Sequence, residues 1–219
     1  MSWDRFENNV KDALINRATE STEPEKSGGN LNVDVELLKI SKIITDEYHS
    51  TVIELTEATG GTNRGFSTVG VATLEVSKSL VEASIFGALK LMQLTRSKPN
   101  TAILSPIGAG VFAYWSSVLI PGSISAFPLP LAQGYSGPLI GSQITFPGNV
   151  LPVVQGFKNA FSNFDDSGNQ SLEQTCEKMA KDLRNGFEAH AQSVTGIYSG
   201  VIPNVVPTPL IVQWVGMNV

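Results

Sequence analysis

The distribution of charge constrains this chain more than any other feature of its sequence. Asp, Glu, Lys, Arg and His are all absent from the 59 residues between Pro99 and Phe157, and again from Ala191 to Val219. In an average soluble domain about one residue in four is charged. Charge-free segments of this length face lipid, are covered by other protein chains, or fold as uncharged loops at the domain surface.

Composition excludes several classes of protein. The 219 residues suffice for one full domain or two small ones. A net charge of −5 gives no reason to expect a nucleic-acid partner, because nucleic-acid binding needs a basic surface. Cys176 is the single cysteine, so no disulfide can form within the chain. Charges at Asp4, Arg5 and Glu7 interrupt any apolar signal-peptide core, and we therefore expect synthesis in a cytoplasm.

Apolar residues at helical spacing predict six helices. Their approximate expected ranges are 3–14, 37–55, 73–94, 107–119, 151–164 and 171–198. We expect Pro106 at the first turn of the fourth helix, where a backbone N–H is not needed. In the third helix, the residues expected to share one apolar stripe are Val76, Leu80, Ala83, Phe86 and either Leu89 or Lys90.

Two local signals mark the ends of helices. Ser171 and Gln174 fit a capping box, in which each side chain binds the backbone N–H of the other residue. The polar run from Thr19 to Asn30 contains a proline and two adjacent glycines, which is typical of a linker. We therefore expect the first helix to be tethered rather than embedded, free to dock on this subunit or on a neighbour.

Proline recurs in both charge-free stretches. Four prolines lie among glycines and serines between Ser123 and Val150, which predicts an extended loop without helix or regular strand. Long loops of this kind are usually functional or interfacial. The segment from Pro203 to Val219 is expected to form one short strand or an extended arm.

The two halves of the chain resemble each other. Trp115-Ser-Ser-Val-Leu-Ile-Pro121 matches Tyr198-Ser-Gly-Val-Ile-Pro203 with one deletion, and Pro128-Leu-Pro-Leu matches Pro207-Thr-Pro-Leu. A duplication predicts a mainly α fold, a helical bundle built from two similar helical halves, each followed by a Pro-rich extended arm. The expected segments are 1–30 (first helix and flexible linker), 31–149 (first helical half) and 150–219 (second helical half). Convergence on proline-rich helix exits is the alternative explanation.

Two segments approach known ligand-binding motifs. The run that begins Asn163-x-Asp165-x-Ser167-Gly168 alternates oxygen ligands as a calcium loop does, but its twelfth position is Gln174 rather than a bidentate glutamate. We interpret it as an acidic turn between two helices. Gly108-x-Gly110-x-x-Ala113 lacks the preceding strand and the later acidic residue of a dinucleotide site. Small residues for close helix packing explain that motif better.

The sequence contains no recognisable catalytic or metal-binding constellation. His49 and His190 are far in sequence from Cys176, and each lies among ordinary helical polar residues, as expected of surface or rim histidines. No serine lies in a nucleophile elbow. We therefore expect no enzyme activity, no cofactor, no metal and no small-molecule substrate. An enzyme with an unfamiliar site is the alternative.

The longest uncharged segment of helical character raises the question of whether it crosses a membrane. Ile103 to Ile120 gives 18 uncharged residues, the short limit for a helix that crosses a bilayer. Pro106 and three serines argue against a span, and no positive residue flanks its far end to set an orientation. A buried helix is the preferred interpretation. A membrane-active protein, holin-like or pore-forming, is the alternative.

Aromatic and proline residues form distinctive strings between residues 105 and 150. They are Phe112-Ala-Tyr-Trp-Ser-Ser-Val-Leu-Ile-Pro-Gly, Phe127-Pro-Leu-Pro-Leu and Ile144-Thr-Phe-Pro-Gly, with a weaker echo at 195–212. This pattern of aromatic and proline residues resembles that of small structural proteins of large tailed-phage virions. The resemblance implies a component of the neck, tail, baseplate or capsid, and it brings no catalytic residues.

These observations predict a non-enzymatic structural subunit that docks on its neighbours through uncharged, Pro-rich arms. The expected partners are other copies of the chain and other structural proteins, in a virion assembled after synthesis in the host cytoplasm. Because aromatic residues are enriched in interface cores, the candidate contact residues are Trp3, Phe6, Tyr114, Trp115, Phe127, Tyr135, Phe146, Tyr198 and Trp214. Several of the nine are expected to pack inside the chain instead.

Overall fold

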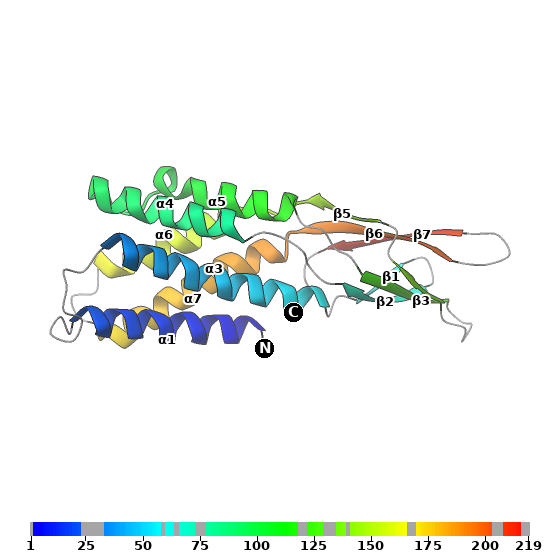
Figure 1. Ribbon diagram of the computed structural model, residues 1–219, viewed down its shortest axis with the longest axis horizontal. Coiled ribbons are helices and arrows are strands. Elements are labelled where there is room, and N and C mark those ends of the chain that lie inside the picture. The colour runs from blue at the N-terminus through cyan, green and yellow to red at the C-terminus, as the bar shows by residue number, and fades with distance from the viewer. Residues whose placement is uncertain are drawn as a thin grey trace.

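The computed structural model is an elongated molecule with a body of helices and strands at one end of that body (Figure 1). It describes residues 2–22, 33–57, 60–63, 66–72, 78–117, 122–128, 135–138, 141–165, 170–202 and 208–215. Within these ranges helix predominates over strand, so the fold is mainly α.

Six helices, counted within the described ranges, form the body. They are α1 (Ser2–Thr22), α3 (Val33–Glu57), α4 (Ser79–Thr95), α5 (Thr101–Ser116), α6 (Leu151–Asp165) and α7 (Leu172–Ala191). Each helix packs against the one before it, and α7 returns to pack against α1, so the bundle is closed. The prediction of a mainly α bundle of packed helices is confirmed.

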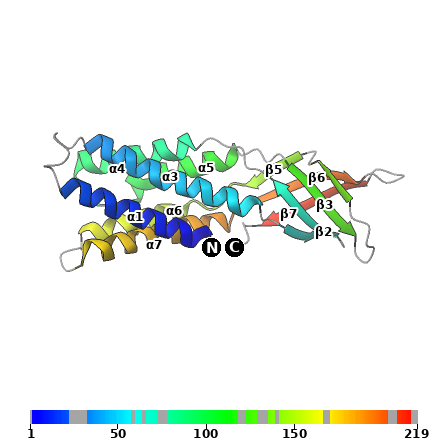
Figure 2. The same cartoon turned by 60° about the horizontal axis from the view of Figure 1, so that its bottom comes forward.

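The strands of the described chain form two antiparallel sheets beside each other at one end of the bundle (Figure 2). In the first sheet the order is β1 (Gly60–Asn63), β2 (Phe66–Ala72), β3 (Gly122–Pro128) and β4 (Tyr135–Pro138). In the second it is β5 (Gly141–Phe146), β6 (Thr195–Ile202) and β7 (Thr208–Val215). None of these strands contains a charged residue.

The strands show that the prediction of a proline loop without regular structure is wrong. Much of residues 123–150 lies in β3, β4 and β5, and β3 pairs with β2 while β5 pairs with β6. A sheet tolerates proline at strand ends and on edge strands, where no ladder hydrogen bond is lost. Accordingly, Pro128 ends β3, whereas Pro138 and Pro209 lie on the edge strands β4 and β7.

The order of elements does not show two similar halves. In the described chain, two helices followed by two antiparallel strands occur three times: α1–α3 with β1–β2, α4–α5 with β3–β4, and α6–α7 with β6–β7. Trp115 lies in α5 whereas the matched Tyr198 lies in β6, so the two similar strings differ in secondary structure. The division into two halves with Pro-rich arms is therefore not confirmed.

The helix α5 begins earlier than predicted and contains its proline. Asn100 caps the helix, because its Oδ1 accepts a hydrogen bond from the backbone N–H of Ile103 at 3.1 Å. Pro106 lies inside the helix and cannot donate to the carbonyl of Ala102. The hydroxyl of Ser105 donates to that carbonyl at 3.0 Å, which explains how the helix continues through the proline.

The helix α7 begins as predicted and ends earlier. The side chain of Ser171 accepts from the backbone of Gln174, and the side chain of Gln174 accepts from the backbone of Ser171, so the capping box is confirmed. The helix ends at Ala191 rather than near residue 198, because the chain from Thr195 onward pairs with β5 and β7.

The first helix is embedded in the bundle, so the prediction that it is tethered is wrong. Trp3 and Phe6 are almost completely buried, and the ring of Phe6 meets that of Phe187 on α7 edge to face, 5.8 Å between centroids. Arg184 of α7 also donates from Nη1 to the Glu7 carboxylate at 2.9 Å. Apolar burial and a charged contact therefore both hold α1 against α7.

The buried face of α4 differs from the predicted stripe. Leu80 and Ala83, both in that stripe, are exposed. The buried residues of the helix are Val81, Ile85, Ala88 and Leu89. Because α4 carries apolar residues on two faces, periodicity in the sequence does not determine which face packs inward.

Candidate interaction surfaces

The nine aromatic residues predicted as contacts fall into three groups. Trp3, Phe6, Tyr114 and Trp115 are at most 1% exposed, so in this fold their side chains contact the rest of the chain rather than a neighbour. Phe146, at the end of β5, is 47% exposed and stays a candidate contact. The remaining four lie in strands, and their side chains are outside the described part of the structure: Phe127, Tyr135, Tyr198 and Trp214.

A hydrogen-bonded aromatic cluster occupies the core of the bundle. The indole N–H of Trp115 donates to the hydroxyl of Tyr48 at 2.8 Å. The Tyr48 ring stacks on Phe187 with centroids 4.3 Å apart, and lies 5.7 Å from the ring of Tyr114. Buried Trp and Tyr need such partners for their polar atoms. Burial raises the pKa of Tyr48 and of Tyr114 far above the usual range, so both hydroxyls stay protonated.

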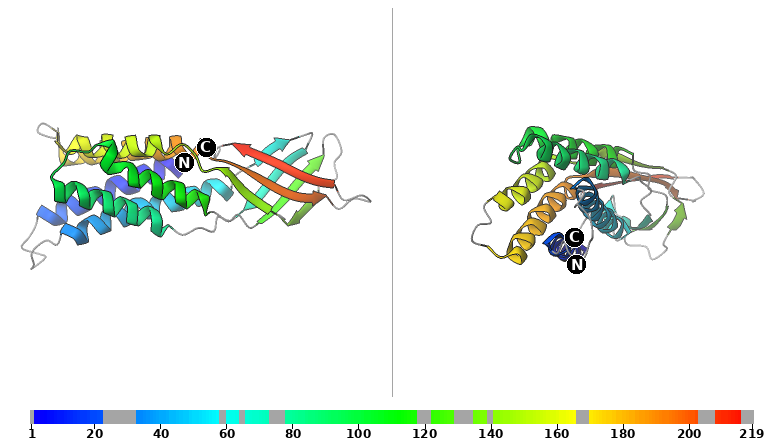
Figure 3. Two further views of the ribbon diagram at one scale, coloured as in Figure 1. Left: turned by 90° about the horizontal axis from the view of Figure 1, so that it is seen from above. Right: turned by 60° about the vertical axis from the view of Figure 1, so that its left-hand side comes forward.

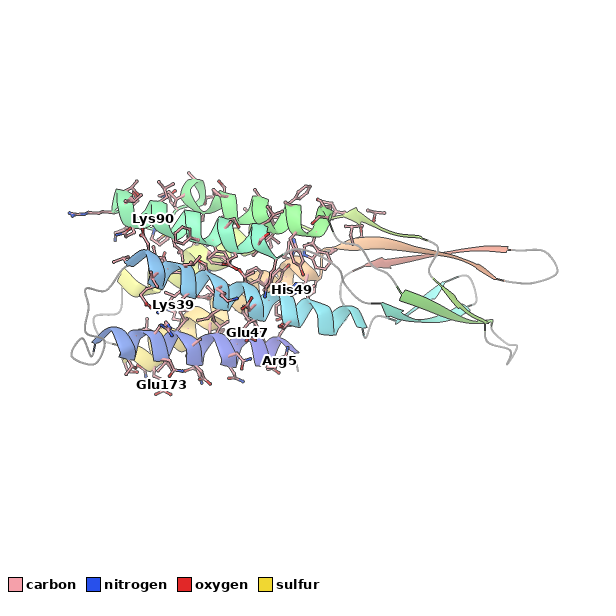
Figure 4. The ribbon with its side chains drawn as sticks, viewed as in Figure 1. Arg5, Lys39, Glu47, His49, Lys90 and Glu173 are labelled. Carbon is pink, nitrogen blue, oxygen red and sulfur yellow. The ribbon has the colours of Figure 1, made fainter. Side chains whose placement is uncertain are left out.

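The two histidines lie beside this cluster rather than free in solvent. His49, labelled in Figure 4, is half-buried, and its Nδ1 lies 2.9 Å from the Tyr114 hydroxyl. His190 is fully buried, which contradicts its prediction as a surface or rim residue. Its Nε2 donates to the carbonyl of Pro147 at 3.0 Å, while its Nδ1 finds no partner in the described residues. Burial lowers the pKa of His190 to about 4, so the ring is neutral at pH 7.

Of the two motifs that approached ligand-binding patterns, the structure describes in full only the glycine motif of α5, and that motif serves helix packing. A Cβ on Gly110 would clash with Ser84 of α4, and one on Gly108 would lie 3.0 Å from Val154 of α6, so these glycines allow close helix packing as predicted. Residues 166–169 of the predicted acidic turn lie outside the described residues. In the described ranges, no group of three or more His, Cys, Asp or Glu could hold a metal ion.

The outer side of α4 and α5 is apolar. Leu80, Leu91 and Leu94 of α4 are 47%, 43% and 65% exposed, and Phe112 of α5 is 46% exposed. The helix α5 contains no charged residue, and Lys90 of α4 forms an ion pair with Asp34 of α3. Exposed apolar residues that are contiguous, unlike scattered ones, mark an interaction site.

The opposite side of the bundle carries charge. The right panel of Figure 3 places α5 and α1 on opposite sides of the bundle. Figure 4 labels Arg5 on α1 and Glu173 on α7, at the side away from α4 and α5. The exposed charged residues of these two helices include Asp4, Arg5, Asp12, Glu173, Glu177, Lys178 and Lys181. This side of the bundle therefore presents charged residues to solvent.

An open groove of about 460 Å³ lies at the end of the bundle away from the strands. Leu37, Met92 and Phe161 contribute apolar lining, and Arg96 and Lys98 contribute positive charge. Among the described residues that line it, only Lys98 is of a type that commonly acts as a general acid or base, and none is a carboxylate, histidine or cysteine.

The uncharged run considered as a membrane span lies largely in α5. Three apolar residues of this helix, Leu104, Ile107 and Val111, are completely buried within the bundle. In the described part of the chain, no helix is both long enough and apolar enough to cross a bilayer.

Sequence reasoning missed the exposed leucines of α4 because it sought contacts among aromatic residues. A signal was present, since Leu80, Gly87 and Leu94 recur at intervals of seven residues on a face different from that of Val81 and Ile85. No protein-family model, curated protein or solved structure matches the chain. Its candidate function therefore rests on burial, exposure and charge.

Proposed function

We propose that this chain is a non-enzymatic structural subunit of a multi-protein assembly, a tailed-phage virion component of the neck, tail, baseplate or capsid. Its partners are other copies of itself and other structural proteins, and it reaches the virion after synthesis in the host cytoplasm. The observation that carries the proposal is the exposed apolar side of α4 and α5, in a bundle whose opposite side is charged.

Covering a charged surface and covering an apolar surface have opposite effects on the free energy of docking. A charged side chain must give up its hydration on docking, whereas an apolar one gains by leaving water. Leu80, Leu91 and Leu94 of α4 and Phe112 of α5 are 43–65% exposed, so they retain apolar area that the described residues leave uncovered and that a neighbour can bury. The ion pair with Asp34 of α3 holds the Lys90 ammonium away from these apolar side chains.

The strand-bearing end supplies the second docking region of the proposal. The segments predicted as Pro-rich arms, residues 123–150 and 203–219, contain β3–β5 and β7. The strand β6 pairs with β5 and β7, and none of these strands carries a charge. Exposed sheet edges normally carry charged residues that prevent pairing with other chains. Uncharged edge strands are therefore suited to contact with neighbouring subunits, and the exposed Phe146 lies in the same region.

Co-sedimentation tests the proposal. Particles from the phage that encodes the chain are purified on a density gradient, and the chain is detected with an antibody. We expect it in the particle band, at a constant ratio to the major capsid protein through successive gradients. Recovery in the host membrane pellet after a carbonate wash, with none in particles, would instead favour the membrane-active alternative and overturn the proposal.

A further inference from the structure

The exposed apolar residues of α4 are spaced symmetrically about Gly87. Ala83 and Leu91 lie four residues to either side, and Leu80 and Leu94 lie seven residues to either side. Steps of three and four residues return to the same face of a helix, so the five residues form one stripe. All five are exposed, and a Cβ added at Gly87 would meet no described atom within 4 Å. The smallest residue thus lies at the centre of the stripe.

We propose that this α4 stripe binds the same stripe of a second copy of the chain, antiparallel, about a twofold axis beside Gly87. The inference names one partner within the assembly proposed above and so rests on that function. In a twofold interface the same patch is used by both copies. The symmetric spacing then sets Leu80 against Leu94 of the second copy, Ala83 against Leu91, and Gly87 against Gly87.

The residue sizes favour this antiparallel register. A small residue, Ala83, faces a large one, Leu91, on both sides of the axis. The paired glycines let the two backbones approach toward the lower end of the usual 8–10 Å separation of packed helices. A parallel pairing in register would set Leu91 against Leu91, where the two large side chains are crowded. It would also set Ala83 against Ala83, where the two small side chains leave a gap. Antiparallel helices also oppose their dipoles favourably.

Charge and area are consistent with a dimer. The ion pair of Lys90 with Asp34 keeps this lysine directed toward α3, off the stripe. The neighbouring α5, seen from above with α4 in the left panel of Figure 3, adds the exposed Ala109 and Phe112 without any charge. Two such helices present a face of roughly 25 by 20 Å, so a dimer buries about 1,000 Å² in total. That area lies below the roughly 1,200–2,000 Å² of stable interfaces and at the minimum of about 1,000 Å² expected of a biological one.

Single-cysteine cross-linking of the full chain tests the register. Gly87→Cys places two thiols beside the twofold axis, whereas Leu80→Cys places its two thiols about 21 Å apart along the helices. A disulfide needs Cα atoms within about 7 Å. With oxidised glutathione as the oxidant, we expect a covalent dimer for Gly87→Cys and none for Leu80→Cys. The wild-type chain is the control, because its one cysteine, Cys176, is buried.

Mixing two variants sharpens the test. Leu80→Cys and Leu94→Cys, each unable to form a disulfide-linked homodimer, are expected to cross-link to each other when mixed. Equal cross-linking at every position would show an unspecific apolar surface and overturn the proposal. Cross-linking at none, with wild-type chain monomeric in sedimentation equilibrium at every concentration, would also overturn it.

A charge substitution gives an independent measurement that does not need the cysteine variants to fold. Leu91→Glu is expected to weaken self-association at least about tenfold, since each copy loses a buried leucine. The matched control is Leu172→Glu on α7, where the leucine is similarly exposed at 42% and lies off the stripe. Equal association of both variants would contradict the proposal.

If the chain is monomeric yet present in particles, only the dimer fails; if it dimerises yet is absent from particles, only the proposed function fails.

Discussion

The two sides of the helical bundle meet solvent differently. The helices α1 and α7 bury aromatic residues inward and expose charged residues outward, the usual amphipathic arrangement. The helices α4 and α5 bury a comparable apolar face, yet α4 exposes leucines and α5 exposes Phe112. Core packing accounts for one apolar face of α4 only. The second face is the one that we propose to contact a neighbouring chain.

The largest expected difference is between the unfolding free energy lost when a core phenylalanine is replaced by alanine and that lost when an outer one is replaced. Phe187 is 0% exposed and packs against Phe6, Tyr48 and Phe157, so Phe187→Ala should cost about 3–5 kcal/mol of unfolding free energy. Phe112→Ala, on the outer side of α5, should cost less than about 1 kcal/mol. Urea unfolding of both variants at low protein concentration measures the difference. Similar losses for the two would show that the α5 side is not an outer surface of the subunit.

Acid should weaken the bundle through His190. The pKa of this buried, neutral ring is about 4, whereas an unperturbed histidine in the unfolded chain titrates near 6.5. The unfolded state therefore binds the extra proton first, so the stabilisation present above pH 6.5 is lost as the pH falls toward 4, by up to about 3 kcal/mol. Thermal unfolding between pH 7 and 4 measures this slope.

The matched variant for this pH prediction is His190→Gln, which retains an N–H donor for the Pro147 carbonyl and does not titrate. It is expected to show a shallower loss of stability between pH 7 and 4 than the wild-type chain, even if it is less stable at pH 7. An identical slope would show that the acid sensitivity arises elsewhere.

Features that depend on local sequence could be predicted. The capping box at Ser171 and Gln174 involves residues three apart, and six helices were expected from spacing alone. Glycines at 108 and 110 were correctly assigned to helix packing, because their motif lacked the flanking elements of a nucleotide site.

Features that depend on distant pairing could not be predicted. The strand β2 pairs with β3, more than fifty residues later in the chain, and the prolines of this region hid the strands because they lie at strand ends and edges. The burial of His190 arises from its contact with Pro147 on another element. On α4 both faces are apolar, so only tertiary packing reveals that Leu80 lies outside and Val81 inside.

Hydroxyl-radical footprinting of the monomeric chain, at a protein concentration too low for self-association, and of the chain in its assembly tests the central claim most directly. Oxidation of exposed side chains is quantified by mass spectrometry in both states. The account predicts that assembly protects Leu91, Leu94 and Phe112, while Leu172 at the start of α7 is oxidised equally in both. Protection confined to α1 and α7, with α4 and α5 unchanged, would contradict it.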